Sequence, residues 1–273
     1  MNRIELSELI YAKLIDKKLQ LREMYQSSQE KIGFFFIDDL LPYEIAKSIY
    51  IQFPNKDDME LKRSIREYKY IAAQMNNYNP ILEEAIFAFQ DEKIVSLIGE
   101  ICEINSLHPD EHLYAGGISM MGAKQFLNPH LDNSHDKDRR MWRVLNLLYY
   151  VTPGWEEEYG GNLELWPNGL RNDKQIQIHS KFNRLVVMAT HNNSWHSVSP
   201  ISEIVESVRC CVSNYYFSES PIRKSDLFHI TSFRGRPDQK VKDFVLRLDA
   251  KIRMQIRKVF RKGIIDTKHR YEK

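Results

Sequence analysis

The residues His130 and Asp132 form the first pair in this sequence whose types and spacing could do chemistry. They lie in the segment Asn128-Pro129-His130-Leu131-Asp132-Asn133. In a β-strand, residues two apart point to the same face, so both side chains would lie together. An imidazole and a carboxylate on one face can bind one metal ion, and they can equally form a hydrogen-bonded pair at the surface.

A second His-x-Asp pair, His108-Pro109-Asp110, competes with the first. The proline between its two members removes a ladder hydrogen bond, which is typical of a loop or of a sheet edge. The neighbouring residues Asp110-Glu111-His112 are strongly polar. We therefore expect His108 and His112 to be loop residues.

Further motifs follow His130 and Asp132 in a fixed order. Tyr149-Tyr150 ends a long apolar run, Gly160-Gly161 comes next, a histidine follows at His196, and Arg209 begins the last β-rich segment. This ordered set resembles the iron(II)- and 2-oxoglutarate-dependent dioxygenases, in particular their prolyl-4-hydroxylase-like branch. The resemblance covers about residues 110–218.

The resemblance implies a set of metal ligands. In this family, two histidines and one carboxylate occupy one face of an octahedral iron(II) ion and leave three positions open. His130, Asp132 and His196 occupy the matching positions and would form the catalytic metal site. His191 lies in the polar run Thr190-His191-Asn192-Asn193, which resembles a turn, and it is the rival for the third position. We expect His135 and His179 at the surface.

The same resemblance makes Arg209 the anchor of the cosubstrate, 2-oxoglutarate. A guanidinium can hold a buried carboxylate through two parallel charge-assisted hydrogen bonds. Strand alternation places Ser213 on the face of Arg209, so its hydroxyl could bind the same carboxylate. The alternative is a solvent-facing arginine that pairs with Glu203 or Glu206.

Tyr150 matches the family position whose phenol binds this carboxylate. Alternation makes Leu148 and Tyr150 share a face and turns Tyr149 away, but a shift of one residue would exchange the two tyrosines. Related hydroxylases often carry another tyrosine about ten residues before His-x-Asp. Here that stretch is Ser119-Met120-Met121-Gly122, so this phenol is missing.

The elements that must position these residues are strands. From about residue 112 to 218, short β-rich runs alternate with turn residues, and no helical pattern separates them. The predicted strands cover residues 112–121, 124–130, 141–152, 162–166, 184–190, 195–199 and 207–217.

The regions before and after this β-rich part have helical patterns. Apolar residues at helical spacing predict helices over 4–26, after Pro42, after Asn79-Pro80 and over 92–102, with a short strand at 33–37. In the tail, apolar spacing predicts a helix from about Pro237 to Gly263. We expect its apolar stripe to pack on the sheet, although its charges could also attract nucleic acid or an anionic surface.

Composition limits the class of protein. The chain has 273 residues, is 42% hydrophobic and 28% charged, and carries a net charge of +2, so nothing drives the whole chain toward nucleic acid. Residues 237–273 hold twelve basic and five acidic side chains. Three cysteines without a CxxC motif predict neither a disulfide framework nor a thiolate zinc site, and favour the cytoplasm. No apolar run is long enough to span a membrane.

These observations predict one α+β domain over 1–273 with a mostly β core, a double-stranded β-helix (jelly roll) flanked by helices. Residues 1–110 would be a helical support region, 111–220 the catalytic core, and 221–273 an extension with a basic amphipathic helix.

The resemblance implies a hydroxylase that uses Fe(2+), 2-oxoglutarate and O2. It would act on a C–H bond of a small-molecule or peptidyl, for example prolyl, substrate and release succinate and CO2. The alternatives are a non-catalytic jelly-roll binding module and a cupin-like metal isomerase or hydrolase. The sequence does not determine the oligomeric state.

Overall fold

The computed structural model describes residues 1–171, 174–260 and 271–272. Its α-helices are α1 (Arg3–Asp16), α2 (Lys18–Ile32), α3 (Tyr43–Ile51), α4 (Pro80–Ala88), α5 (Glu92–Cys102) and α6 (Lys240–Val259). Its strands are β1 (Phe34–Ile37), β2 (Glu60–Arg63), β3 (Glu67–Ala72), β4 (Leu107–Pro109), β5 (Gly117–Met121), β6 (Phe126–Leu131), β7 (Trp142–Tyr150), β8 (Leu163–Leu165), β9 (Ile176–Ile178), β10 (Arg184–Ala189), β11 (His196–Val198), β12 (Arg209–Ser218) and β13 (Ser232–Phe233).

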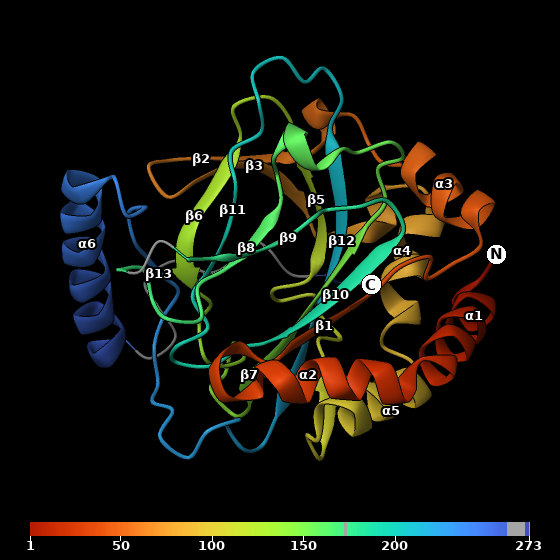
Figure 1. The fold of residues 1–273 in the computed structure, drawn as a ribbon, viewed down its shortest axis with the longest axis horizontal. Coiled ribbons are helices and arrows are strands. Elements are labelled where there is room, and N and C mark those ends of the chain that lie inside the picture. The colour runs from red at the N-terminus through yellow and green to blue at the C-terminus, as the bar shows by residue number, and fades with distance from the viewer. Residues whose placement is uncertain (172–173, 261–270, 273) are drawn as a thin grey trace.

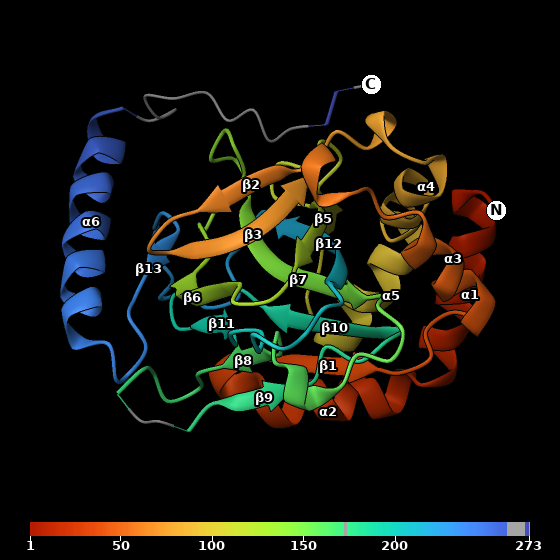
Figure 2. The same cartoon turned by 90° about the horizontal axis from the view of Figure 1, so that it is seen from above.

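The strands form one curled antiparallel sheet that folds into a double-stranded β-helix, as predicted. Its order is β1-β10-β7-β12-β5-β3-β6-β11-β8-β9, with β2, β4 and β13 bonded at the sides. Strand β3 pairs with both β5 and β6, so it joins the half of the sheet that contains β7, β10 and β12 to the half that contains β8, β9 and β11 (Figure 2). Apolar side chains of β7, β8, β10 and β12 fill part of the space between these halves.

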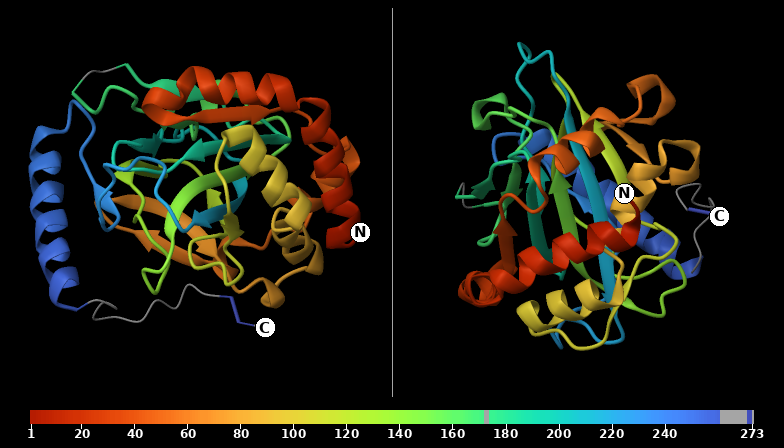
Figure 3. Two further views of the ribbon diagram at one scale, coloured as in Figure 1. Left: turned by 90° about the horizontal axis from the view of Figure 1, so that it is seen from below. Right: turned by 90° about the vertical axis from the view of Figure 1, so that its right-hand side faces the viewer.

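Five helices, α1 to α5, gather on one side of the sheet (Figures 1 and 3). Their starts follow the local sequence: Asn2 and Glu5 form a capping box on α1, and Asn79 caps α4 just before Pro80. The buried face of α1, including Leu6 and Ile10, shares one hydrophobic core with β7 and β10. This core fixes the outer surface of the strands that carry part of the site.

Most of the predicted elements are present, with three differences. The helix expected over 4–26 is two helices that meet at Lys17, which lets both of them bury apolar residues against the same core. The hairpin β2–β3 lies in the region expected to be helical, and its strand β3 completes the sheet between β5 and β6. Strands β9 and β13 are only two or three residues long, which is too short for a period-2 pattern to be recognised.

The expectation that the apolar stripe of α6 packs on the sheet is wrong. Val241, Phe244, Leu248 and Ile252 are exposed, and among the α6 side chains that the structure describes only Leu246 is buried. The helix is held to the body of the protein through its charged side instead, by ion pairs of Asp243 and Asp249. It begins at Lys240 rather than at Pro237, and the predicted stop at Gly263 lies outside the described residues.

Candidate metal centre

Three predicted ligand residues converge at one end of the β-helix. His130 lies on β6 opposite His196 on β11, and Asp132 follows β6 directly. The carboxylate oxygens of Asp132 lie 3.6 Å from His130 Nε2 and 3.7 Å from His196 Nε2. One donor atom from each of the three residues falls within 4.8 Å of the others. This is the spacing of groups that can share one metal ion.

Backbone carbonyls fix the orientation of both imidazoles. His130 Nδ1 lies 3.0 Å from the carbonyl oxygen of Asn128, and His196 Nδ1 lies 2.9 Å from that of Ser194. When Nδ1 carries the proton and donates a hydrogen bond to the carbonyl oxygen, Nε2 is unprotonated. Its lone pair then points toward Asp132. Burial and the neighbouring His130 lower the pKa of His196 to about 4, which favours this neutral form.

The carboxylate of Asp132 is buried and ionised. Burial by itself would raise its pKa, but the two imidazoles when protonated, together with the Arg143 guanidinium, outweigh burial and hold the pKa well below its usual range. Oδ2 of Asp132 is buried, and no described residue donates a hydrogen bond to it. A buried anionic oxygen without a donor fits a bound cation.

The surroundings of the two histidines are closely packed. Phe233 on β13 stacks on His130, with ring centroids 5.2 Å apart and planes inclined by 17°. Next to His196, the Ser197 hydroxyl donates to Glu164 at 2.6 Å and accepts from Trp166 Nε1 at 2.8 Å. Arg236 forms an ion pair with the buried Glu164 and so ties the segment after β13 to β8.

Arg209 and Ser213 line a cavity of about 130 Å³ beside the three ligands. Arg209 is 4% exposed, and its Nε and Nη1 make no hydrogen bond to any part of the chain that the structure describes. Glu203 pairs with Lys124 at the surface, so it is not the partner of this guanidinium. A buried cation with free donors in a small cavity fits an anionic ligand.

Strand register places Tyr150, and not Tyr149, on the side of this cavity. Tyr150 lies opposite Cys211, belongs to the cluster that contains Leu148, and has its ring 5.1 Å from the Arg209 guanidinium. Its hydroxyl makes no hydrogen bond within the described ranges, and burial raises the pKa of Tyr150 well above the usual range. Tyr149 points away, because its hydroxyl donates to Asn183 at 2.7 Å.

Three further residues at the site were not predicted. Arg143 lies 3.8 Å from Asp132 and over the ring of Tyr215, although simple alternation would place it with Tyr149 on the other face. A bulge at Val144 breaks this alternation and reverses the face to which the Arg143 side chain points. Asn146 and Lys69 line the cavity. Asn146 is the one polar residue in the apolar run Val144–Leu148, a signal that was present in the sequence, whereas Lys69 lies on the unpredicted strand β3.

The other histidines lie outside the ligand set among the described residues. His191 is buried in the predicted turn, where its Nδ1 accepts a hydrogen bond from the backbone of Asn193. His108 lies on the short strand β4, paired with β12, and not in the expected loop. His135 and His179 are partly buried rather than at the surface: His135 contacts Trp142, and His179 Nε2 lies 2.8 Å from the carbonyl of Trp155.

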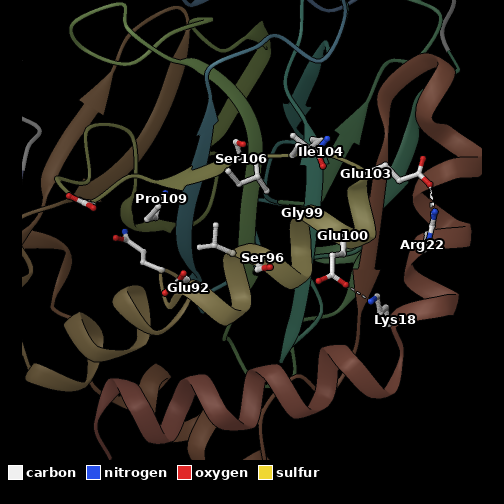
Figure 4. Close-up of a pocket in the computed structure, with 15 residues that line it drawn as sticks. Lys18, Arg22, Glu92, Ser96, Gly99, Glu100, Glu103, Ile104, Ser106 and Pro109 are labelled. Atoms are coloured by element: carbon white, nitrogen blue, oxygen red, sulfur yellow. Dashed lines mark hydrogen bonds and ion pairs between the residues drawn. The ribbon is translucent and has the colours of Figure 1, made fainter.

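A larger hollow of about 730 Å³ lies away from this site, between α2, α5 and β4 (Figure 4). The ion pairs Lys18–Glu100 and Arg22–Glu103 cross it. None of the predicted site residues lines it. The small cavity at the three ligands is therefore the one that matches the chemistry.

Comparison with known proteins agrees with the geometry of the metal site. Residues 116–217 match the model of the family described as the 2OG-Fe(II) oxygenase superfamily. No curated protein sequence matches the chain.

Solved structures with similar folds include three prolyl hydroxylases. A Pseudomonas putida prolyl-4-hydroxylase has 15% identity and a TM-score of 0.54, over 72% of this chain and 98% of its own. A Trichoplax adhaerens prolyl hydroxylase, in complex with a peptide fragment of hypoxia inducible factor, has 20% identity and a TM-score of 0.53, over 75% and 92%. A Phytophthora capsici prolyl 4-hydroxylase has 17% identity and a TM-score of 0.55, over 92% and 78%.

A double-stranded β-helix with two histidines and one aspartate at its end defines the class of metal-dependent oxygenases. Residues 116–217 match the 2OG-Fe(II) oxygenase superfamily, and the fold is like that of the prolyl-4-hydroxylases. The protein is a 2-oxoglutarate-dependent dioxygenase whose cofactors are Fe(2+), 2-oxoglutarate and O2. Among the described helices, none is both long and apolar enough to cross a membrane.

Proposed function

We propose that this protein hydroxylates a C–H bond of a small-molecule or peptidyl substrate at the site formed by His130, Asp132 and His196. The observation that carries the proposal is the convergence of these three donors, within 4.8 Å, beside the buried guanidinium of Arg209. When bound, iron(II) and 2-oxoglutarate would allow O2 to oxidise a substrate C–H bond to C–OH. In the same reaction 2-oxoglutarate would be decarboxylated to succinate and CO2.

The residues present fit iron(II). Two neutral imidazoles and one carboxylate are the donor set of non-haem iron oxygenases, and they leave positions open for other ligands. The unpartnered Oδ2 of Asp132 supports this assignment. Arg143 keeps the carboxylate ionised, and the two backbone carbonyls hold the imidazoles in the tautomer that can bind a metal.

The residues beyond the metal ligands fit the distal carboxylate of 2-oxoglutarate. Arg209 offers two unpartnered donors, and Ser213 lines the same cavity. The ring of Tyr150 lies 5.1 Å from the Arg209 guanidinium, and its hydroxyl has no hydrogen-bond partner among the described residues. A buried guanidinium and two hydroxyl groups would hold this carboxylate and exclude water from it.

The substrate we propose is a small molecule or a peptide. Ser119 and Met121 line the cavity in the stretch where related hydroxylases often carry a tyrosine. Lys69 adds a cation to the same wall and pairs with Glu67 at 3.1 Å. This wall differs chemically from that of the prolyl hydroxylases, so a prolyl peptide is only one substrate to test. The three buried, free cysteines are compatible with the reducing cytoplasm.

Substitution of the ligands tests the proposal. His130→Ala and Asp132→Ala should each lose bound iron, measured by metal analysis, together with succinate release from 2-oxoglutarate. His191→Asn is the matched control, because this buried histidine lies outside the ligand set; it should keep both iron and turnover. Wild-type turnover in both ligand variants would show that the ligand assignment is wrong.

Anaerobic titration separates cosubstrate binding from turnover. Iron(II) followed by 2-oxoglutarate should produce the weak visible charge-transfer band of a chelated keto acid in the wild-type protein. The band should be lost in His130→Ala. A protein that binds iron but never shows this band would not use 2-oxoglutarate as proposed.

A further inference from the structure

The outward side of α6 is an apolar surface that other parts of the described protein leave uncovered. Val241, Phe244, Leu248 and Ile252 are 81%, 70%, 51% and 53% exposed, and Val245 and Ile256 are exposed as well. Their spacing of three or four residues places them along one side of the helix. Figures 1 and 2 show α6 as the outermost element, beyond β13.

The charged side of α6 faces the body of the protein, which fixes the helix in this orientation. Asp243 forms an ion pair with Arg234, and Asp249 forms one with Arg66. Lys242 lies 4.8 Å from the ring centroid of Phe126. Rotating the helix to bury its apolar side would break both ion pairs and expose Leu246, which is now fully buried. The exposed stripe is therefore a property of the folded protein.

A row of basic side chains borders the apolar stripe. Lys240, Arg247, Lys251 and Lys258 are all exposed, and their spacing of seven, four and seven residues places them along one edge of the stripe. The whole helix carries seven basic and two acidic residues, and both acidic residues, Asp243 and Asp249, are paired with arginines. The surface offered outward is apolar and positively charged.

We propose that α6 binds the surface of an anionic lipid bilayer and lies in its plane. A helix with an apolar stripe and a basic border buries the stripe at the acyl boundary and leaves the cations at the anionic headgroups. A 20-residue helix is about 30 Å long, and the stripe runs along all of it, so a flat surface can contact its full length. This inference does not depend on the reaction at the metal site.

Charge argues against a second copy of this chain as the occupant. A two-fold contact through the stripe would bring the basic rows of two helices together. A partner that encloses the helix is also disfavoured, because the opposite side of α6 is already bonded to β13 and the β2–β3 hairpin through Arg234 and Arg66. A bilayer needs only the one side that is free.

Flotation with vesicles of the intact chain tests this inference. The protein should float with vesicles of equal parts phosphatidylcholine and phosphatidylglycerol, much less with phosphatidylcholine alone, and less at high salt. Leu248→Glu/Ile252→Glu should reduce binding to the mixed vesicles by at least about tenfold. Lys251→Glu/Lys258→Glu should reduce it by about tenfold as well. All four side chains are exposed, so circular dichroism and the melting temperature should stay unchanged.

Ile15→Glu/Leu19→Glu is the matched control, because these exposed apolar residues lie at the junction of α1 and α2; this variant should float like the wild type. Failure of the wild type to float with the mixed vesicles would overturn the inference, and so would wild-type flotation of Leu248→Glu/Ile252→Glu. A wild-type dimer in light scattering that becomes monomeric in this variant, without vesicle binding, would assign the stripe to self-association instead.

Discussion

The buried guanidinium of Arg209 shows how one residue can define a ligand. A charge in this environment is costly unless it is paired, yet two of its three nitrogens have no partner among the residues that the structure describes. The same holds for Oδ2 of Asp132 at the other end of the site. One residue therefore needs an anion and the other a cation, and their positions in one small cavity suit a cosubstrate that bridges them.

Replacing Arg209 should weaken 2-oxoglutarate binding specifically. A charge-assisted hydrogen bond contributes about 1.5–3 kcal/mol, so Arg209→Ala should raise the KM for 2-oxoglutarate by about a hundredfold. Arg209→Lys, which keeps the charge but not the paired donors, should have a smaller effect. Iron content serves as the control and should not change. An unchanged KM in Arg209→Ala would remove this residue from the cosubstrate site.

The three cysteines should be inert in the folded protein. Cys102, Cys210 and Cys211 are buried, and burial raises the pKa of Cys210 to about 12 and those of the other two thiols above their usual value. Because the reactive form is the thiolate, almost none is present at pH 8. A colourimetric thiol reagent should therefore label the native protein only very slowly at pH 8 and all three cysteines after unfolding. Rapid labelling of the native protein would contradict this burial.

At the scale of elements, Asn183 connects segments that are far apart in the sequence. It precedes β10 with a positive φ of 61°, a conformation that asparagine tolerates better than most residues. Its side chain accepts from the backbone of Leu41 and from the Tyr149 hydroxyl, and it donates to the Leu41 carbonyl at 2.6 Å. This single amide holds the segment after β1 against β7, the strand that carries Tyr150.

Asn183→Ala should destabilise the fold. The substitution leaves buried donors and acceptors without partners, so the free energy of unfolding should fall by about 3 kcal/mol. Urea denaturation followed by circular dichroism would measure it. Asn193→Ala, at an exposed asparagine in the turn before β11, is the control and should change stability by less than about 0.5 kcal/mol. Equal stability of the two variants would show that the Asn183 amide is not a structural link.

At the scale of the whole molecule, the N-terminal helices and the β-helix share one hydrophobic core. Leu6 of α1 lies in the same buried cluster as Leu145 of β7 and Leu185 of β10. The four tryptophans all lie between Trp142 and Trp195, in the β-rich part of the chain. Tryptophan fluorescence and helical circular dichroism therefore report on different regions, which allows the predicted single domain to be tested.

Leu6→Ala should shift both signals together. Removing a fully buried leucine costs about 2–5 kcal/mol, and in one cooperative unit this loss lowers both unfolding midpoints equally. Leu19→Ala, at a residue that is 75% exposed, should leave both midpoints in place. If the unfolding midpoint measured by circular dichroism shifts while the midpoint measured by tryptophan fluorescence does not, the helical region and the β core unfold as separate units.

Much of the fold and of the candidate site follows from local sequence patterns. The period-2 spacing of His130 and Asp132 sets them on one side of β6, and the same alternation separates Tyr150 from Tyr149. Strand-forming runs, and Asn79-Pro80 at the start of α4, predicted the positions of most elements. These features depend on neighbours in the chain, so the sequence determines them by itself.

Two features were decided only by the tertiary structure. Arg143 faces Asp132 because a bulge at Val144 adds one residue against β12, and nothing in the local alternation reveals it. The apolar pattern of α6 defines which residues share a side of the helix, but it cannot say which side meets the body of the protein. Arg66 and Arg234 determine the orientation of the helix, because their ion pairs with Asp249 and Asp243 hold its charged side against the body of the protein. Arg66 lies far from α6 in the sequence, so only the folded chain brings these partners together.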